Sequence, residues 1–296
     1  MSVLAVGTVA YDTISTPNKF QKNILGGSAA FFSIACSKFS KVSLMAVVGE
    51  DFYQKDTNLL EQNNIDLSGF ETIQGETFKW SGEYFGKNLK DRKTIKTQLN
   101  VLSKFNPILS KKHKKSNYLF LANMSPETQL SVLKQFDSRP NLVVMDTMNF
   151  WIENNYYSLL KMINTTDVIL VDTGEAMQIT SEKNIKDAGE KLLQLGPSIV
   201  IIKEGELGST VFSKEFTFSV PAFKVPEVID PTGAGDSFAG GLLGYLSQTK
   251  STYSQNTLKE ALKYATILGS FAVESFSVNQ LAKINLNEIK LRINNL

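Results

Sequence analysis

A glycine-rich turn that carries an aspartate, Asp230–Asp236 (DPTGAGD), is the part of this sequence best suited to chemistry. Its small residues Gly233, Ala234 and Gly235 leave backbone N–H groups open directly before an apolar run at helical spacing. Free N–H groups at the start of a helix favour an anion, whereas the carboxylate of Asp236 would repel one. The conflict disappears if Asp236 removes a proton from a nucleophile while the N–H groups hold a phosphoryl group. The motif therefore predicts a phosphoryl-transfer site.

The same residues could form only a tight turn with a helix cap, because Gly and Asp are favoured in both. The flanking sequence, with DPT before the small residues and FAGGLLGYL after Ser237, argues against that simpler interpretation. Three glycines in the apolar helix, Gly240, Gly241 and Gly244, each cost about 1 kcal/mol relative to alanine. We expect close packing of this helix against another element to explain them.

The scarcity of histidine and cysteine excludes several kinds of site. The one histidine, His113, lies in the basic run Lys111–Lys115, which is expected to be a solvated connection or helix face. A Ser-His-Asp triad or a multi-histidine metal site is therefore not expected. Any acid–base catalysis is expected to use the carboxylates of Asp and Glu. The one cysteine, Cys36, excludes an internal disulfide and favours a reducing compartment.

The net charge and the hydropathy of the chain limit the partners that it is expected to bind and the compartment in which it is expected to lie. A net charge of +2 gives no reason to expect nucleic acid or an acidic membrane surface as a partner. The N-terminal MSVLAVGTVAYD enters a strand pattern without a basic region, and no apolar stretch approaches the ~18 residues of a membrane span. We expect a cytoplasmic protein without a signal peptide or a transmembrane helix.

Short apolar runs recur along the chain, and most are followed by a helical pattern. They lie at Val3–Val6, Lys41–Val48, Tyr118–Ala122, Leu142–Asp146, Val168–Val171 and Ile199–Lys203. Runs without alternation suit strands buried on both faces, and their alternation with helices predicts parallel βαβ units in an α/β fold. Ligands in such sheets bind beyond the carboxyl ends of the strands, and Asn123, Asp146 and Asp172 stand where three of these runs end.

Two segments depart from this pattern. Residues 11–25 are polar and turn-rich, and residues 72–101 contain two alternating stretches, Phe78–Phe85 and Thr94–Val101, joined by a basic turn. Alternation predicts a β-hairpin or a small sheet, which cannot belong to a parallel core buried on both faces. GEYFGKN, within this region, has the wrong glycine spacing and the wrong context for a P-loop, and no G-x-G-x-x-G dinucleotide spacing occurs at the C-terminal motif.

The chain resembles the ribokinase-like, or PfkB, family of carbohydrate and nucleoside kinases. The family signature D-T-x-G-A-G-D is similar to Asp230–Asp236, and its N-terminal double glycine is matched in LGGSAAFF. An early Gly–x4–Asp is matched by Gly7 to Asp12, while N-x-x-E is matched only approximately, by Asp172–Glu175. The matches follow the family's order from residue 3 to about residue 280.

The resemblance implies a ribokinase-like three-layer αβα sandwich with a mostly parallel central sheet, in one kinase domain over residues 1–296. It also implies that roughly residues 11–25 and 72–101 form a small β lid over the substrate. A lid that excludes water favours phosphoryl transfer over ATP hydrolysis. Lids of this family often carry a dimer contact, so a homodimer through the lid is a further expectation.

The resemblance assigns catalytic roles to the glycine-rich turn. Asp236 would be the catalytic base, and the backbone of Gly233–Gly235 would form the anion hole. Asp230 and Thr232 match positions that help to form a monovalent-cation site in several family members, so K⁺ is an implied cofactor beside ATP and Mg²⁺.

Substrate contacts are implied near the N-terminus. Asp12 would accept hydrogen bonds from substrate hydroxyls, and Gly26 and Gly27 would let the backbone approach the substrate closely. The alternatives are a cap or turn residue for Asp12 and a plain helix-start turn for the glycines. Asn123 and Gln129 are further candidates for hydroxyl contacts.

The segment IIKEGELGS resembles the family's strand and loop beside the nucleotide, with Lys203, Gly205 and Gly208 as its contacts. Lys203 would approach a phosphate or, alternatively, be an ordinary surface lysine. Asp172 replaces the usual Asn of N-x-x-E, which would strengthen binding of Mg²⁺ or water, and Glu175 is expected in the magnesium–water network.

Substrate class is harder to derive. In DTMNFW, Met148 and Phe150 stand where family members that act on acidic sugars have Asn and Arg, so bidentate capture of a carboxylate is disfavoured. Aromatic residues of the lid could stack on a nucleobase or simply pack: Phe78, Trp80, Tyr84 and Phe85.

The sequence therefore predicts an ATP-dependent kinase that phosphorylates a hydroxyl, preferably a primary one, of a neutral sugar. A nucleoside kinase is the alternative, because both classes share this machinery. A non-catalytic sugar- or nucleotide-binding regulator on the same fold is a third interpretation, against which the intact Asp236 argues.

Overall fold

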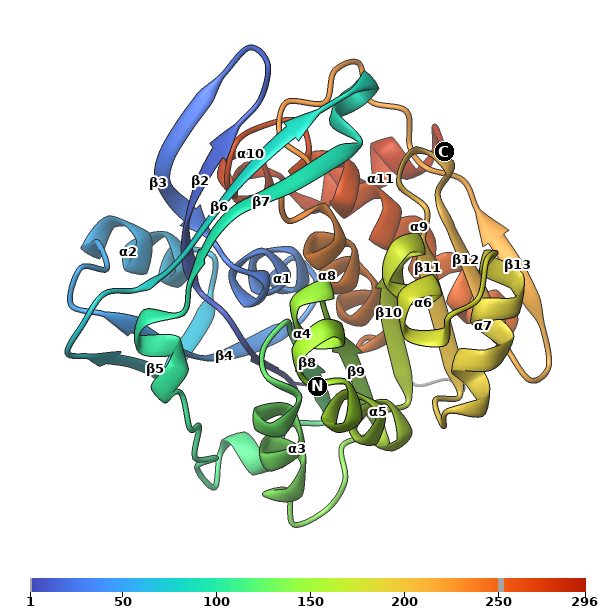
Figure 1. The fold of residues 1–296 in the computed structure, drawn as a ribbon, viewed down its shortest axis with the longest axis horizontal. Helices are drawn as coiled ribbons and strands as arrows, with labels where there is room; N and C mark the ends of the chain where they lie inside the picture. The colour runs from blue at the N-terminus through green and yellow to red at the C-terminus, as the bar shows by residue number, and fades with distance from the viewer. Residues whose placement is uncertain (1, 250–252) are drawn as a thin grey trace.

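The computed structural model describes residues 2–249 and 253–296 and is built around one large sheet (Figure 1). The strand order is β13-β12-β11-β10-β9-β8-β1-β4-β5, and the strands from β11 to β5 are parallel. The bounds are β1 Ser2–Val6, β4 Lys41–Gly49, β5 Ile65–Ile73, β8 Tyr118–Leu121, β9 Leu142–Asp146, β10 Val168–Asp172, β11 Ile199–Lys203, β12 Ser209–Ser213 and β13 Thr217–Val220.

Helices cover both faces of this sheet and complete three layers. The bounds are α1 Ser28–Ser37, α2 Gln54–Gln62, α3 Pro126–Lys134, α4 Asn149–Asn154, α5 Tyr156–Thr165, α6 Thr173–Thr180, α7 Ile185–Gln194, α8 Ala234–Leu246, α9 Gln255–Ala272, α10 Asn279–Lys283 and α11 Leu286–Ile293. Alternate strand residues enter two cores: Val3 and Ala5 pack with α1, α8 and α9, whereas Leu4 and Val6 pack with α3, α5, α6 and α7.

Burial on both faces explains why the strands read as continuous apolar runs, since neither face meets water. The six strands expected from those runs are all present and parallel, which confirms the predicted α/β sandwich. Sequence reasoning missed β5 at one edge and the antiparallel pair β12 and β13 at the other. The edge strands β5 and β13 are partly exposed, so their apolar signal is weaker, and β12 begins and ends with serine.

A second sheet of four strands, β3-β2-β6-β7, stands over the carboxyl edge of the large sheet, at the upper left in Figure 1. It is made by β2 Ala10–Ser15, β3 Phe20–Gly26, β6 Phe78–Phe85 and β7 Asp91–Gln98. The two segments predicted to form a β lid are therefore paired in one sheet. The last strand starts at Asp91 rather than at the predicted Thr94, because the charged residues Asp91–Lys93 pair with Glu83–Phe85 across the hairpin.

The glycines of α8 fit the close packing expected of them. A Cβ on Gly240 would lie 2.5 Å from the backbone oxygen of Phe32 in α1, and one on Gly241 would lie 2.8 Å from the backbone oxygen of Tyr264 in α9. α8 thus lies wedged between two helices at a spacing that alanine would not allow.

The prediction of a solvated His113 was wrong. Its side chain is buried, and its Nε2 atom lies 3.2 Å from Oγ of Ser68. Burial lowers the pKa of this imidazole, so it is held neutral within the fold. The charged tips of the lysines around it are what made the segment look solvated; Lys112, for example, reaches Asp66 at 2.6 Å.

Among the described helices, none combines the length and the apolar composition needed to span a bilayer.

Candidate active site

A cavity of about 310 Å³ lies between the carboxyl edge of the large sheet and the small sheet. Its floor is formed by residues at the ends of β9, β10 and β11 and by the start of α8, and its roof by side chains of β2, β6 and β7. The edge where parallel strands end is the expected ligand site of an α/β sheet. Of the residues predicted to act in catalysis or to bind substrate, cofactor or metal, eleven line this cavity: Asp12, Gly27, Asn123, Asp172, Glu175, Lys203, Gly205, Thr232, Gly233, Gly235 and Asp236. Four others, Gly26, Gly208, Asp230 and Ala234, lie behind the lining.

The glycine-rich turn enters α8 through Gly233, which caps the helix in a left-handed conformation with φ 76°. A side chain there would collide with the ring of Phe31, so only glycine fits. The next residues, Ala234, Gly235 and Asp236, form the first turn of the helix. The N–H of Ala234 donates to the backbone oxygen of Pro231 at 3.2 Å, whereas the N–H groups of Gly235 and Asp236 have no partner within the helix. The turn therefore has the geometry of an anion site.

Asp236 lies in the first turn of α8 and lines the cavity. Burial, and next the negative charge of Asp146, raise the pKa of Asp236 to about 7, while Lys203 and Arg92 oppose the rise. A carboxylate that titrates near neutrality can accept a proton from a hydroxyl far better than an ordinary aspartate.

Asp12 lies in β2, inside the cavity and nearly inaccessible to water. Burial, followed by the charges of Asp230 and Asp236, raises its pKa well above the usual range, and the N–H of Gly27 opposes the rise. A Cβ on Gly26 would collide with the Asp12 carboxylate, and one on Gly27 would lie 2.5 Å from the Thr8 backbone oxygen. Gly26 therefore makes room for Asp12, while Gly27, with φ 95°, lines the cavity itself.

Asp172 and Glu175 form a reciprocal cap at the start of α6. The Asp172 side chain accepts from the N–H of Glu175 at 2.8 Å, and the Glu175 side chain accepts from the N–H of Asp172 at 2.8 Å. Burial, and then the charge of Asp172, raise the pKa of Glu175 to about 8. Both carboxylates line the cavity, an oxygen-rich wall of the kind that Mg²⁺ and its waters prefer.

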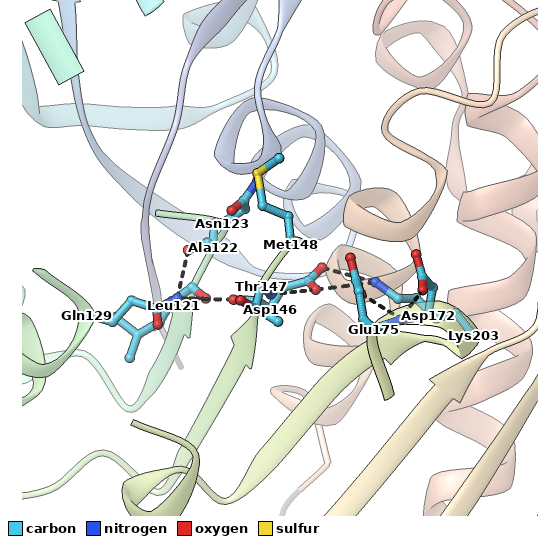
Figure 2. Close-up of polar contacts among 10 residues, drawn as sticks. All are labelled: Leu121, Ala122, Asn123, Gln129, Asp146, Thr147, Met148, Asp172, Glu175 and Lys203. Carbon is cyan, nitrogen blue, oxygen red and sulfur yellow. Dashed lines mark hydrogen bonds and ion pairs between the residues drawn. The ribbon is translucent and has the colours of Figure 1, made fainter. Parts of the chain in front are cut away.

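The side chain of Lys203 is only 17% exposed and lines the cavity, which excludes the surface-lysine alternative. Its Nζ atom lies 3.1 Å from Oδ2 and 3.4 Å from Oδ1 of Asp146 (Figure 2). The loop that follows turns sharply at Gly205, with φ 59°, and at Gly208, with φ 109°, where a side chain would collide with Val220. Gly208 therefore shapes the β11–β12 hairpin from behind, and Gly205 borders the cavity.

Asp230 is fully buried beneath the turn. Its Oδ1 atom accepts from the N–H of Thr232 at 2.9 Å, whereas Oδ2 has no hydrogen-bond partner among the described residues. Burial raises the pKa of Asp230 to about 6. A buried carboxylate oxygen without a partner is costly unless a cation or water completes it, so this position fits a cation.

Asn123 follows β8 and has a fixed orientation. The indole Nε1–H of Trp151 donates to its Oδ1 at 2.8 Å, and an indole can only donate. The Nδ2 group must then point the other way, where its partner is the sulfur of Met148, a weak acceptor (Figure 2). Asn123 therefore offers the cavity a hydrogen-bond donor.

The prediction for Gln129 was wrong, because its amide nitrogen is used by the fold. It donates to the backbone oxygens of Leu121, Ala122 and Asp146 at 3.3, 3.0 and 3.1 Å, and Gln129 does not line the cavity.

The aromatic strand of the small sheet faces the cavity. Phe78, Trp80 and Tyr84 line it, whereas Phe85 points to the other face and is exposed. Gly82, between them, leaves the room that the Trp80 ring occupies. The Tyr84 hydroxyl lies 3.1 Å from Oγ1 of Thr232, which ties the roof to the glycine-rich turn.

Two charged lining residues were not predicted as site residues. Asp146 ends β9, a position that sequence reasoning noted without giving it a role, and Arg92 comes from β7 in the basic stretch taken for a turn. Only the position of Asp146 at a strand end was a usable signal. Nothing local marks Arg92, because its place above the cavity depends on how the two sheets meet.

A mostly parallel α/β sheet, an anion turn ending in a half-buried aspartate and a β roof together define a phosphotransferase of the ribokinase fold. The chain belongs to the pfkB family of carbohydrate kinases, which it matches over residues 2–284.

Three similar proteins illustrate the range of the family. A cytidine kinase of Thermococcus kodakarensis is 27% identical, over 83% of this chain and 88% of that protein. The crystal structure of the Methanocaldococcus jannaschii nucleoside kinase has a TM-score of 0.79 at 22% identity, covering 100% of this chain and 98% of that one. A double mutant of the Vibrio cholerae fructokinase, with fructose, ADP and a potassium ion, has a TM-score of 0.82 at 18% identity, covering 99% and 98%. At these identities the two structures establish the fold.

Proposed function

We propose that this protein transfers the γ-phosphoryl group of ATP to a primary hydroxyl of a nucleoside. The observation that carries the proposal is the place of Asp236: a half-buried carboxylate in the first turn of α8, beside backbone N–H groups without a helical partner, where desolvation raises its pKa to about 7. A protein that only bound anions there would gain nothing from a negative charge in the same turn.

In the proposed reaction, Asp236 accepts the proton of the acceptor hydroxyl as its oxygen attacks the γ-phosphorus. A new P–O bond forms to that oxygen, the bond to the β–γ bridging oxygen breaks, and ADP leaves with the electron pair. The N–H groups of Gly235 and Asp236 hold the transferring group, and Asp12 holds neighbouring hydroxyls.

The nucleotide phosphates would lie against Lys203 and Gly205, with Gly208 shaping the loop from behind. Mg²⁺, when bound, would neutralise phosphate charge. Glu175 and Asp172 would hold it through water, since both acidic groups line the cavity. K⁺ would fit beside Asp230 and Thr232, where the Oδ2 atom of Asp230 has no partner among the described residues.

The nucleoside assignment rests on the roof of the cavity and on similar proteins. Phe78, Trp80 and Tyr84 offer ring faces and edges to the substrate, which suits a planar base better than a small sugar. The similar cytidine kinase extends over most of both chains. A neutral sugar, which the sequence favoured, is the second candidate, supported by the fructokinase likeness.

Asn123 provides a test that separates these candidates. A nucleobase carbonyl can only accept a hydrogen bond, whereas a sugar hydroxyl can also donate. In Asn123→Asp the donor becomes an acceptor, so we expect a nucleoside bound through a carbonyl to lose roughly 10- to 100-fold in affinity. The measurement is calorimetric titration with cytidine and with fructose.

Trp151→Phe is the matched control, because it keeps Asn123 but removes the indole that fixes its orientation. A smaller loss of nucleoside affinity is expected there, since the amide can still turn its donor inward. Equal affinity of the wild type and Asn123→Asp for cytidine would contradict the assigned donor.

A homodimer through the small sheet is also proposed. Large apolar side chains are exposed on three of its strands, Phe20, Phe85 and Ile95, with exposed fractions of 62%, 43% and 57%. A second copy would bury such side chains. Sedimentation analysis of the wild type and of Ile95→Lys would test this; a wild-type monomer at micromolar concentration would contradict it.

The decisive experiment is ADP release from Mg·ATP across a panel of nucleosides and neutral sugars, with and without potassium. Turnover that depends on a nucleoside supports the proposal, and turnover with sugars alone supports the second candidate. If no acceptor raises ADP release but a panel member stabilises the protein against heat, a binding regulator becomes the better interpretation.

A further inference from the structure

The ion pair between Asp146 and Lys203 crosses the end of a strand that lies between them. Asp146 ends β9 and Lys203 ends β11, and β10 separates the two strands in the sheet. The pair therefore bridges over the point where β10 turns into α6, beside the cap of Asp172 and Glu175 (Figure 2). Its two side chains are 17% and 6% exposed, so little solvent screens the attraction.

The Asp146 end of the pair is held rigidly. Its Oδ1 accepts from the N–H of Thr147 at 2.9 Å, and its backbone oxygen accepts from Nε2 of Gln129 at 3.1 Å. Because Gln129 also holds the backbone oxygens of Leu121 and Ala122, it ties the ends of β8 and β9 together. The carboxylate is thus a fixed acceptor, whereas lysine carries its charge on a flexible stem.

The Lys203 end lies against the anion turn. A Cβ on Gly235 would be 3.0 Å from the Lys203 Nζ atom, which places the ammonium group beside the backbone that precedes Asp236. Besides Asp146, the charges of Glu175 and Asp236 also attract this ammonium. The ion pair that forms is with Asp146, and neither of the other two carboxylates lies within ion-pair distance of the ammonium.

We infer that Asp146 is a positioning residue: its fixed carboxylate holds the Lys203 ammonium at the anion turn and keeps it from closing on the catalytic aspartate. A lysine free to pair with Asp236 would stabilise the charged carboxylate and weaken it as a base. The inference rests on the proposed function for the role of Asp236 as a base. The electrostatic coupling itself does not depend on catalysis.

Other charged groups around Asp236 also affect its pKa, in addition to Asp146 and Lys203. Arg92 acts on it from β7, Asp12 from β2, and Asp172 and Glu175 line the same cavity from the start of α6. All of them are unchanged in the variants below, so differences between variants report Asp146 and Lys203.

The test is a titration of the Asp236 carboxyl in the ligand-free protein by carbon-13 NMR, with the resonance assigned by its absence in Asp236→Asn. We expect a midpoint near pH 7 in the wild type. In Asp146→Asn it should fall by about one pH unit, because a like charge is lost and Lys203 is released. In Lys203→Met it should rise by about one pH unit, since the cation is gone.

The double variant Asp146→Asn/Lys203→Met decides the mechanism. If Asp146 acts through Lys203, the downward shift should be smaller in the Lys203→Met background, where only the loss of the charge of Asp146 itself remains. An equal downward shift in both backgrounds, or none in either, would overturn the inference. Glu274→Gln is the control: it breaks the remote ion pair with Arg292, 3.0 Å long, and should leave the midpoint unchanged.

Turnover separates this inference from the proposed function. An unchanged NMR coupling with no acceptor turned over would refute the kinase proposal alone. With an active acceptor, Asp146→Asn should lower kcat more than it raises KM, and Asp146→Glu should restore part of kcat. A variant that merely misfolds would lose both the native NMR spectrum and the thermal transition.

Discussion

Replacing Asp236 by asparagine is expected to lower kcat by roughly 10³- to 10⁴-fold while leaving both substrates bound. Asparagine has nearly the same shape but cannot accept the hydroxyl proton at neutral pH. The backbone N–H groups at the start of α8 and the rest of the cavity are unchanged in this variant. The measurement is steady-state ADP release at saturating acceptor and Mg·ATP.

Two further measurements test whether the loss of kcat in Asp236→Asn comes from the missing base rather than from lost binding or misfolding. Heat stabilisation by nucleotide and by acceptor should persist in Asp236→Asn, because binding does not need the base. The ligand-free variant should be at least as stable as the wild type near neutral pH, since a carboxylate whose pKa is raised by desolvation has been made neutral. A variant that retains more than about a tenth of wild-type kcat would refute the assigned base.

Replacing Asp12 by asparagine is expected to change catalysis and stability in opposite directions. Loss of a charged acceptor for the substrate hydroxyls should reduce kcat/KM by roughly 10- to 100-fold, mostly through KM. The free energy of unfolding should rise at neutral pH, because the charged form of Asp12 is disfavoured by burial and by Asp230 and Asp236. Acceptor titrations and thermal unfolding measure the two effects.

The pH dependence of the stability difference follows from the direction of the pKa shift. The pKa of Asp12 is higher in the folded state than in the unfolded chain. Its contribution to stability is therefore complete below the unfolded pKa and is lost as the pH rises through the folded pKa. The stability advantage of Asp12→Asn over the wild type should grow with pH across that window.

Asp51→Asn is a matched control of opposite sign. Hydrogen bonds from the Thr77 hydroxyl and N–H, at 2.6 and 2.7 Å, lower the pKa of Asp51 in spite of partial burial. Its stabilising contribution exists above the unfolded pKa and is lost as the pH falls, so this variant should be less stable at neutral pH. If Asp12→Asn is also less stable than the wild type at neutral pH, other contacts compensate the burial of the Asp12 carboxylate. The raised pKa assigned to Asp12 is then refuted.

Much of the fold was predictable because its signals are local. A strand buried on both faces must be apolar at every position, and the six runs that satisfy this became neighbouring parallel strands. The glycine-rich turn could also be predicted from the sequence. Only glycine fits at position 233, with φ 76° beside the Phe31 ring, and Asp236 follows it in the first helical turn. The alternating stretches Phe78–Phe85 and Thr94–Val101 predicted a sheet with one solvated face.

What the local pattern could not reveal is which side chains meet across distant parts of the chain. Asp146 and Lys203 are 57 positions apart and pair only because β9 and β11 flank β10. The donor direction of Asn123 depends on Trp151 from another helix, and Arg92 reaches the cavity only because the small sheet covers the large one. His113 was misjudged for the same reason, since its burial is decided by neighbours far away in sequence.

The sequence by itself therefore determined the class of chemistry, through the glycine-rich turn with its aspartate and the strands whose ends frame them, because each is encoded in a few adjacent residues. The tertiary structure decided the charge environment and the polarity of the cavity, which fix the pKa of Asp236 and the donor that Asn123 presents. Electrostatic and hydrogen-bond energies depend on distances between groups. In a folded chain those distances are set by the packing of the sheets and helices.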